Sequence, residues 1–347
     1  MEGNGIPLVH ELPAVGKNLA DHCSVPVIME VPLKDSLHQL ETLLGILWHM
    51  ILYLFFGTGL LASSSTPASA FLRTTTLNED TMTVQAVDGE GSTMDASDPR
   101  NIPDAEIMVT PINCLSAVVP GLSLSSFYPT LTQPFSRGRV ELASTDAGAH
   151  PRIIYPMLED KRDVIALRRV TRFAMHLAER FQASGYPHPA PVKFGPGMDL
   201  EYLEALYEAE RDEENHGGTH LDVRPTPAGN SAPELKASAN AKAEALKKQA
   251  QLRNLNWRDV TDRDIDEYAK RVCVTSLHFS STCRMSLGPE DGVVDQRLKV
   301  HGLRNLRIAD ASVFPKIPSA HTMAPTVMVA ERCAEFLKTE WTERKEK

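Results

Sequence analysis

The sequence predicts a mixed protein of α-helices and β-strands, of the α+β or α/β class, with about two domains. Three observations support this prediction. The chain has 347 residues, and one domain takes roughly 100–200 residues. Residues 136–142 alternate apolar and charged side chains, as a half-buried strand does. Residues 159–183 and the segment after residue 322 instead have the apolar pattern of amphipathic helices.

The composition argues against several classes of protein. Apolar residues make up 42% of the chain and charged residues 23%, as in ordinary globular proteins. The net charge of −9 argues against a nucleic-acid binder and against a polybasic membrane tether. Aromatic residues make up only 6%, which argues against stacking platforms for single-stranded nucleic acid.

The cysteines and the N-terminus bear on localisation. The five cysteines are scattered without a C-x-x-C pair, which fits neither a disulfide framework nor a zinc site. The first thirteen residues have no basic and no apolar region of a secretory signal. Localisation stays open, and the cysteine pattern favours a reducing compartment such as the cytoplasm.

Residues 43–56 form an apolar run, LLGILWHMILYLFF. It is shorter than the roughly 20 residues of a membrane span, so we expect a buried helix in a large core. The next residues, GTGLLA (57–62), match the outline of a dinucleotide-binding fingerprint. We do not assign that function, because SSSTP follows where a phosphate-binding helix must begin.

The remaining segments alternate between polar and patterned stretches. Residues 75–102 indicate an exposed loop, and residues 208–253 a solvated insertion that is partly helical around 234–253. Strands that end at Asp310 are predicted from Leu298, Val300, Leu303, Leu306 and Ile308. A final helix, with Pro325 in its first turn, is predicted to bury Met323, Val327, Ala330, Ala334 and Leu337.

Two histidines are candidates for acid–base chemistry. His278 lies in LHFSSTCRM, and His321 lies in PSAHTMAP just before the last predicted helix. A histidine titrates near neutral pH and can take a proton from an alcohol. A helix N-terminus also presents unpaired N–H donors that stabilise negative charge. Most of the twelve histidines are expected to have ordinary surface or core roles, so the pattern alone does not assign a catalytic role to either one.

Other candidate sites carry less information. Asp310 follows the apolar stretch LRIA, where a cofactor contact and a turn cap are equally well supported. His216 and His220 have metal-ligand spacing, but Gly217 and Gly218 disrupt the helix that would align them. No G-x-S-x-G motif occurs, so a nucleophile of the α/β-hydrolase type is not indicated.

Several motifs resemble one known family in their order and spacing. In the tail these are HFSSTCRM (278–285), GVVD (292–295), LKVHG (298–302), LRNLRIADAS (303–312) and HTMAPT (321–326). Upstream, LPAVGKNLADH (12–22) and SRGRVEL (136–142) continue the pattern. Together they resemble the glucose–methanol–choline (GMC) oxidoreductases, which are FAD-dependent enzymes that oxidise alcohols. The resemblance covers nearly the whole chain except residues 208–256.

The resemblance implies catalytic roles for two residues. His278 corresponds to the family's first active-site histidine, the expected general base for the substrate hydroxyl. His321 corresponds to the second position, which is His or Asn in the family and hydrogen-bonds the same oxygen. The hydride is then expected to pass from the carbinol carbon to N5 of the flavin.

The resemblance also implies contacts with FAD. Asp310 and Ala311 correspond to a stretch near the ribityl-diphosphate of the cofactor. His321, Thr322 and Met323 correspond to positions near the flavin ring, where a helix N-terminus favours the electron-rich reduced form. Ser281 and Ser286 stand where many relatives have glycine.

The implied architecture is a truncated GMC-type fold with an antiparallel-sheet substrate domain and a partial FAD-binding domain. We expect residues 1–23 to be a remnant of the FAD-binding domain. Residues 24–270 are expected to form the substrate-binding domain, with a charged insertion at 208–256. Residues 271–347 are expected to form the C-terminal FAD-domain segment that carries both histidines.

The family's FAD-binding βαβ unit precedes the LPAVG motif, which starts here at residue 12. We therefore expect the region that binds the ADP half of FAD to be missing, and apolar faces that pack against it to be exposed.

We expect an FAD-dependent oxidoreductase that acts on the CH–OH group of a small-molecule alcohol, without nucleic-acid or membrane partners. A competing hypothesis is a non-catalytic or partner-dependent fragment, in which a partner chain supplies the missing FAD-binding region. A membrane-associated protein, from residues 43–62, and non-redox chemistry on the same scaffold are two further hypotheses.

Overall fold

The computed structural model describes residues 5–85, 98, 101–117, 119, 121–214 and 256–345. It has mixed α and β structure with antiparallel sheets, which confirms the predicted fold class. The strands are β1 (Lys17–Leu19), β2 (Cys23–Ser24), β3 (Val27–Glu30), β4 (Ala68–Leu72), β5 (Ala105–Thr110), β6 (Leu124–Leu131), β7 (Gly138–Glu141), β8 (Arg152–Ile154), β9 (Val192–Phe194) and β10 (Val274–Thr275). The helices are α1 (Leu43–Phe56), α2 (Lys161–Gln182), α3 (Leu200–Glu214), α5 (Asp262–Val272) and α6 (Met323–Lys345), with short 3₁₀ turns that include η3 (Leu37–Glu41), η4 (Leu60–Ala62) and η7 (Ala311–Val313).

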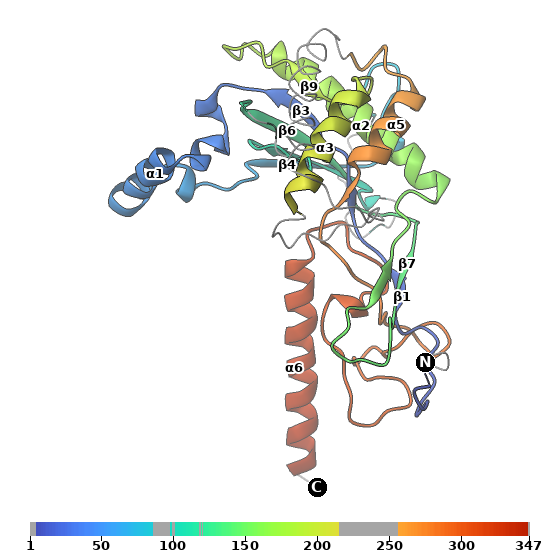
Figure 1. Cartoon of the computed structure of the whole chain (residues 1–347). Coiled ribbons are helices and arrows are strands. Elements are labelled where there is room, and N and C mark those ends of the chain that lie inside the picture. The colour runs from blue at the N-terminus through green and yellow to red at the C-terminus, as the bar shows by residue number, and fades with distance from the viewer. Residues whose placement is uncertain are drawn as a thin grey trace.

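The larger sheet is built around β6. Its strand order is β10–β2–β6–β3–β9, and β5 pairs with both β6 and β4. Helix α2 lies against β3, β5 and β6, and α5 packs on α2 (Figure 1). The strands β2 and β10 are distant in sequence, so this sheet brings the N-terminal motif to the segment that carries His278.

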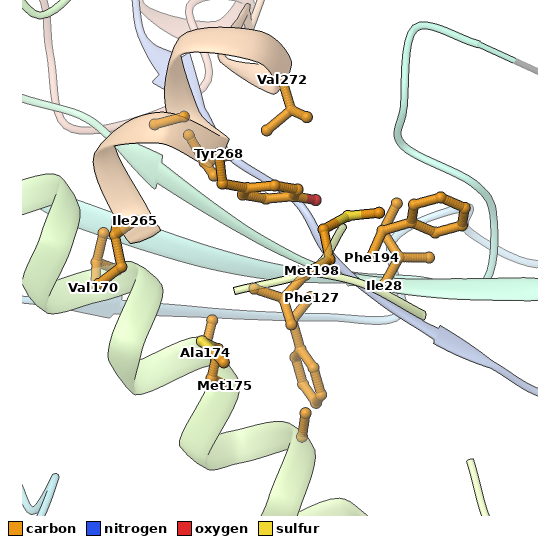
Figure 2. Close-up of a cluster of buried hydrophobic side chains, with 14 of the residues drawn as sticks. Ile28, Phe127, Val170, Ala174, Met175, Phe194, Met198, Ile265, Tyr268 and Val272 are labelled. Atoms are coloured by element: carbon orange, nitrogen blue, oxygen red, sulfur yellow. The ribbon is translucent and has the colours of Figure 1, made fainter. Parts of the chain in front are cut away.

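The main core lies between this sheet and its helices. Helix α2 matches the helix predicted at 159–183, and it buries residues three or four positions apart: Leu167, Val170, Ala174, Met175 and Ala178. Figure 2 shows Val170 of α2 beside Ile265 of α5, and the same buried cluster includes Tyr268 of α5 and Phe194 of β9. The fully buried Tyr268 hydroxyl donates to the carbonyl oxygen of Pro26 at 2.9 Å. A buried hydroxyl needs such a partner, and this bond fixes α5 to the start of β3.

A smaller sheet and a second apolar cluster form outside the main core. The order β1–β7–β8 confirms a strand within the predicted segment 136–142. The second apolar cluster consists of Ala14, Val293, Val294, Leu298, Val300, Val313 and Cys333. The predicted domain boundaries stay predictions.

The prediction of a buried helix at 43–56 is right for the helix and wrong for its burial. Thr42 caps α1 at its N-terminus and Gly57, in the left-handed region, ends it. Only His49 is buried, because α1 packs on the two 3₁₀ turns η3 and η4 and projects from the sheet (Figure 1). Leu44, Phe55 and Phe56 are 70–80% exposed. No helix among the described residues combines the length and apolarity needed to cross a membrane.

The GTGLLA stretch has neither of the neighbours that a dinucleotide fingerprint needs. Helix α1 precedes it where a strand is required, and the three-residue η4 follows where a full helix is required. His49 Nδ1 accepts from the backbone N–H of Leu60, so the stretch closes a turn around α1.

Two predictions for the tail are wrong in part. Residues 298–308 form isolated bridges and turns rather than strands, because Leu298 and Gly302 have positive φ and reverse the chain. Helix α6 is present with Pro325 in its first turn, but its predicted buried face is largely exposed: Met323 79%, Val327 55% and Leu337 51%. Cys333 is the side chain that α6 buries instead. Periodicity shows which face is apolar but not what covers it.

The two predicted polar segments are only partly described. Within 75–102, Leu77 and Met82 are buried in the main core, so the expectation of an exposed loop is wrong there. Residues 86–97, 99–100 and 215–255, with His216, His220 and the predicted helical part 234–253, lie outside the described residues.

The backbone of Gly16 links the N-terminal motif to strand β7 and to the segment after His278. Its N–H donates to the carbonyl oxygen of Thr282 at 2.8 Å, and its carbonyl accepts from Val140 at 2.7 Å. Its φ is +75°, and a Cβ there would collide with the carbonyl oxygen of Val140.

We therefore expect Gly16→Ala to lower the free energy of unfolding more than Gly185→Ala does. Gly185 has φ +86° with nothing within 4 Å of an added Cβ, so that variant bears only the left-handed backbone cost of about 1–2 kcal/mol. The collision should add about 1–3 kcal/mol at Gly16. Urea unfolding of both variants checks this, and equal losses would contradict it.

Candidate active site

Three histidines meet where β2 and β10 join the larger sheet. His278 follows β10 and His321 precedes α6, and their ring centroids lie 5.1 Å apart. The fully buried His22, which precedes β2, makes an edge contact with His278 at 4.9 Å between centroids. The structure thus brings together the two histidines that the sequence singled out, 43 positions apart in the chain, and adds a third.

Asp21 holds the backbone around His278. One oxygen of its buried carboxylate accepts from the His278 backbone N–H at 2.8 Å, and the other accepts from the Thr275 hydroxyl. Between them, Leu277 adopts a positive φ of 60°. A leucine rarely takes this conformation, so the bonds on both sides of it are needed to maintain the turn.

Hydrogen bonds also hold the ring of His22. Its Nδ1 lies 2.9 Å from Nδ1 of His278, and its Nε2 lies 3.1 Å from the carbonyl oxygen of Pro318. The loop that carries Pro318 is fixed in turn, because Gln133 donates to the carbonyl oxygen of Ile317 at 2.7 Å. Both ring nitrogens of this buried side chain are therefore satisfied.

His321 has an acidic neighbour. Its Nε2 lies 3.3 Å from a carboxylate oxygen of Glu106, which projects from β5 and is 2% exposed. The other oxygen of Glu106 accepts from the Ser69 hydroxyl of the neighbouring strand β4. The side chain of His321 itself is 54% exposed, so one of the three rings faces solvent.

Burial sets the charge of the histidines. It lowers the pKa of His22 to about 4, with a further lowering from the nearby His278. The pKa of His278 is also lowered, first by burial and then by His321. Both rings are therefore neutral at neutral pH, and a neutral imidazole is the form that accepts a proton. Burial has the opposite effect on the Asp21 carboxyl and raises its pKa to about 6, against three hydrogen bonds that lower it.

The residues predicted to contact a cofactor lie at η7 and around the start of α6. Asp310 caps η7 by accepting from the Ser312 backbone N–H at 2.8 Å, and the carbonyl oxygen of Ala311 accepts from Ser281 at 3.2 Å. The segment after His278 therefore runs along residues 311–313. The carbonyl oxygen of Thr322 starts the hydrogen bonding of α6, and the Met323 side chain is 79% exposed. No cluster of metal-ligating side chains occurs among the described residues.

Comparison with known proteins identifies the family. The family model described as GMC oxidoreductase matches residues 134–330, more than half of the chain. The chain belongs to the GMC oxidoreductase family. The resemblance noted from the sequence motifs is thereby confirmed.

Individual GMC oxidoreductases match along nearly the whole chain. Oxygen-dependent choline dehydrogenase 1 of Chromohalobacter salexigens is 25% identical over an alignment of 346 positions that covers 97% of this chain and 46% of that protein. Dehydrogenase str4 of Strobilurus tenacellus is 27% identical, over 96% of this chain and 47% of that protein. The chain spans about half the length of the curated relatives it matches. A variant of Aspergillus oryzae formate oxidase has the same fold, with a TM-score of 0.65 and 22% identity over 99% of this chain and 50% of that one.

Three residues of this candidate site were not predicted from the sequence. Asp21 and His22 end the LPAVGKNLADH motif, but a motif does not show what its last residues contact. Glu106 lies in AEIMVT, where a single acid among apolar strand residues is a signal for a buried, paired carboxylate. Each of the three contacts a partner that is distant in sequence.

The pKa of His22 makes the stability of the protein depend on pH. In the unfolded chain His22 takes up a proton near its ordinary pKa of 6.5, whereas the folded protein resists protonation down to about 4. Its contribution to stability is therefore present above pH 6.5 and is lost as pH falls towards 4. Asp21 opposes this loss, because its raised folded pKa favours folding as pH falls below about 6.

We expect His22→Asn to reduce the acid sensitivity of folding. The loss of stability between pH 7 and pH 5 should be smaller in the variant by about 2 kcal/mol, because Asn does not titrate while Asp21 remains in both proteins. Urea unfolding of both proteins at the two pH values measures this difference. An equal loss in both would show that His22 is not held neutral by burial.

Proposed function

We propose that this GMC oxidoreductase takes part in the FAD-dependent oxidation of the CH–OH group of a small-molecule alcohol. The observation that carries the proposal is the convergence of His278 and His321, with ring centroids 5.1 Å apart and one ring open to solvent. Two imidazoles at this distance can both contact one hydroxyl oxygen. The names of relatives support the substrate class, because choline, the substrate named for the choline dehydrogenases, is an alcohol.

The surface around the histidines fits a flavin ring. Leu277 and Phe279, on either side of His278, are 69% and 40% exposed, and Met323 beside His321 is 79% exposed. Such apolar side chains match the faces of a flat aromatic ring. The backbone N–H groups at the start of the 23-residue helix α6 match its polar edge. Asp310, Ala311, His321, Thr322 and Met323 are the residues that we propose to contact FAD.

In the proposed reaction the chain's own residues handle the proton. His278, neutral because burial lowers its pKa, accepts the proton of the substrate hydroxyl as general base. His321 hydrogen-bonds the same oxygen and orients the alcohol. Bound FAD supplies the acceptor for the hydride of the carbinol carbon, so that the alcohol leaves as an aldehyde or ketone.

The first test is whether the chain holds the cofactor. The purified chain is incubated with FAD, passed through gel filtration and examined by visible absorbance. Retained flavin absorbance supports the proposal, and an alcohol panel that includes choline then tests turnover. A colourless protein would favour the alternative, a partner-dependent fragment. The exposed apolar side chains of α6 are the observation that keeps this alternative open.

His278→Ala should lower the rate of alcohol oxidation at least about 100-fold, because general-base catalysis contributes roughly 10²–10⁴-fold. The assay uses FAD-loaded protein at saturating alcohol. His150→Ala is the matched control, because His150 is exposed, lies outside the helices and strands, and has no assigned role in the site. Circular dichroism confirms folding of both variants. An unchanged rate in His278→Ala would exclude this residue as the base.

The pH dependence of the reaction should report the same residue. We expect kcat/KM to rise with pH as His278 loses its proton, and to level off with an apparent pKa below the ordinary 6.5 because burial opposes the charged form. A pH–rate profile from pH 5 to 9 measures this. A midpoint above 6.5 would contradict the assignment of His278 as the base.

A further inference from the structure

The hydrogen-bond chain behind His278 determines where its protons lie. The carbonyl oxygen of Pro318 can only accept, so the His22 Nε2 at 3.1 Å from it carries a hydrogen. A neutral imidazole has a single N–H, so Nδ1 of His22 is then a bare acceptor. Nδ1 of His278 lies 2.9 Å from that acceptor and must donate to it. Nε2 of neutral His278 is therefore left with a free lone pair.

The neutral state of His22 has independent support. The side chain is fully buried, and burial lowers its pKa to about 4. The ring of His278 makes an edge contact with the ring of His22, with centroids 4.9 Å apart, and this neighbour further disfavours a positive charge on His22. Among the described residues, no acidic side chain is bonded to the ring of His22. The carboxylate of Asp21, next in sequence, is directed to Thr275 and to the backbone of His278.

Asp21 and His22 hold different parts of His278 in place. Asp21 binds the backbone N–H of His278 at 2.8 Å, and His22 binds its ring. The backbone bond alone leaves the ring free to rotate about its side-chain torsions. The ring bond to His22 removes that freedom and also selects which nitrogen carries the hydrogen.

We propose that His22 is a positioning residue that holds His278 in the tautomer whose Nε2 is the unprotonated nitrogen aimed at the substrate. This inference rests on the proposed function for its catalytic meaning, because the lone pair on Nε2 is the one that takes the hydroxyl proton. His22 itself touches no substrate. It acts only through the ring of His278, as the carboxylate of a catalytic triad acts through its histidine.

The first test needs no cofactor and no activity. Long-range ¹H–¹⁵N correlation spectra of the chain labelled with ¹⁵N-histidine distinguish a ring nitrogen that carries a hydrogen from a bare one. The signals of His278 are identified by their loss in His278→Gln. We expect Nδ1–H and a bare Nε2 in the unmodified protein at pH 7.5. A hydrogen on Nε2 of His278 would overturn the proposal, even if no variant of His22 folds.

Two substitutions of His22 test whether its hydrogen bond sets the tautomer of His278. His22→Phe keeps a ring of similar size but removes the acceptor, so His278 should shift towards the Nε2–H tautomer. His22→Asn places an amide oxygen near the position of Nδ1 and should keep the Nδ1–H tautomer. His176→Phe is the control for loss of a histidine elsewhere, since His176 packs against Phe173 and Trp257. Spectra of His22→Phe that match the unmodified protein would overturn the proposal.

Kinetics of the FAD-loaded proteins give the second readout. We expect His22→Phe to lower kcat at least about tenfold with little change in KM, because a wrong tautomer removes the base without removing substrate binding. His22→Asn should restore a large part of that loss. A loss in His22→Phe that appears only in KM, or that His22→Asn does not restore, would overturn the catalytic part. An inactive unmodified protein with the expected tautomer would instead contradict the proposed function and leave the structural role of His22 supported.

Discussion

The site depends on the pairing of residues 20–22 with residues 275–280. The backbones of Ala20 and Ser280 exchange hydrogen bonds at 3.1 and 2.9 Å, and Ser276 donates to the carbonyl oxygen of His22 at 3.0 Å. Strands β2 and β10 continue this pairing into the larger sheet. His22 and His278 are 256 positions apart, so only this long-range pairing places their rings in contact. The turn at Leu277 and the contact between His22 and His278 are both built on it.

The buried polar groups explain why this contact is rigid. Burial of a polar or charged side chain is unfavourable unless each group finds a partner. Asp21, His22 and Glu106 are all buried, and each is bonded on both of its oxygens or nitrogens. Removal of one partner leaves the other unsatisfied at a cost of about 1–3 kcal/mol, so the native arrangement is strongly preferred over alternatives. The same burial keeps the two inner imidazoles neutral, as a base requires.

Elements whose signal lies within their own residues could be predicted from the sequence, and features set by distant residues could not. Helix α2 was predicted to within two residues because its apolar face repeats over six turns, and β7 because its alternation lies within SRGRVEL. The burial of α1 was predicted wrongly, because an apolar run shows a tendency to be covered but does not identify a cover. The strands predicted at 298–308 failed for a related reason. Positive φ at Leu298 and Gly302 turns the chain there, and a leucine gives no sequence signal for this.

The sequence by itself determined the family, the two candidate histidines and the helices α1, α2 and α6, because motifs and periodicity are properties of neighbouring residues. It gave no prediction of α3 or α5. Only the tertiary structure decided which nitrogens face which partners. Glu106 reaches His321 from a strand more than 200 residues earlier, and His22 reaches both His278 and Pro318 from the N-terminal motif. Hydrogen bonds between side chains so distant in sequence depend on how the sheet is paired. That pairing is a property of the whole fold, and it sets the protonation and orientation of the ring that we propose as the base.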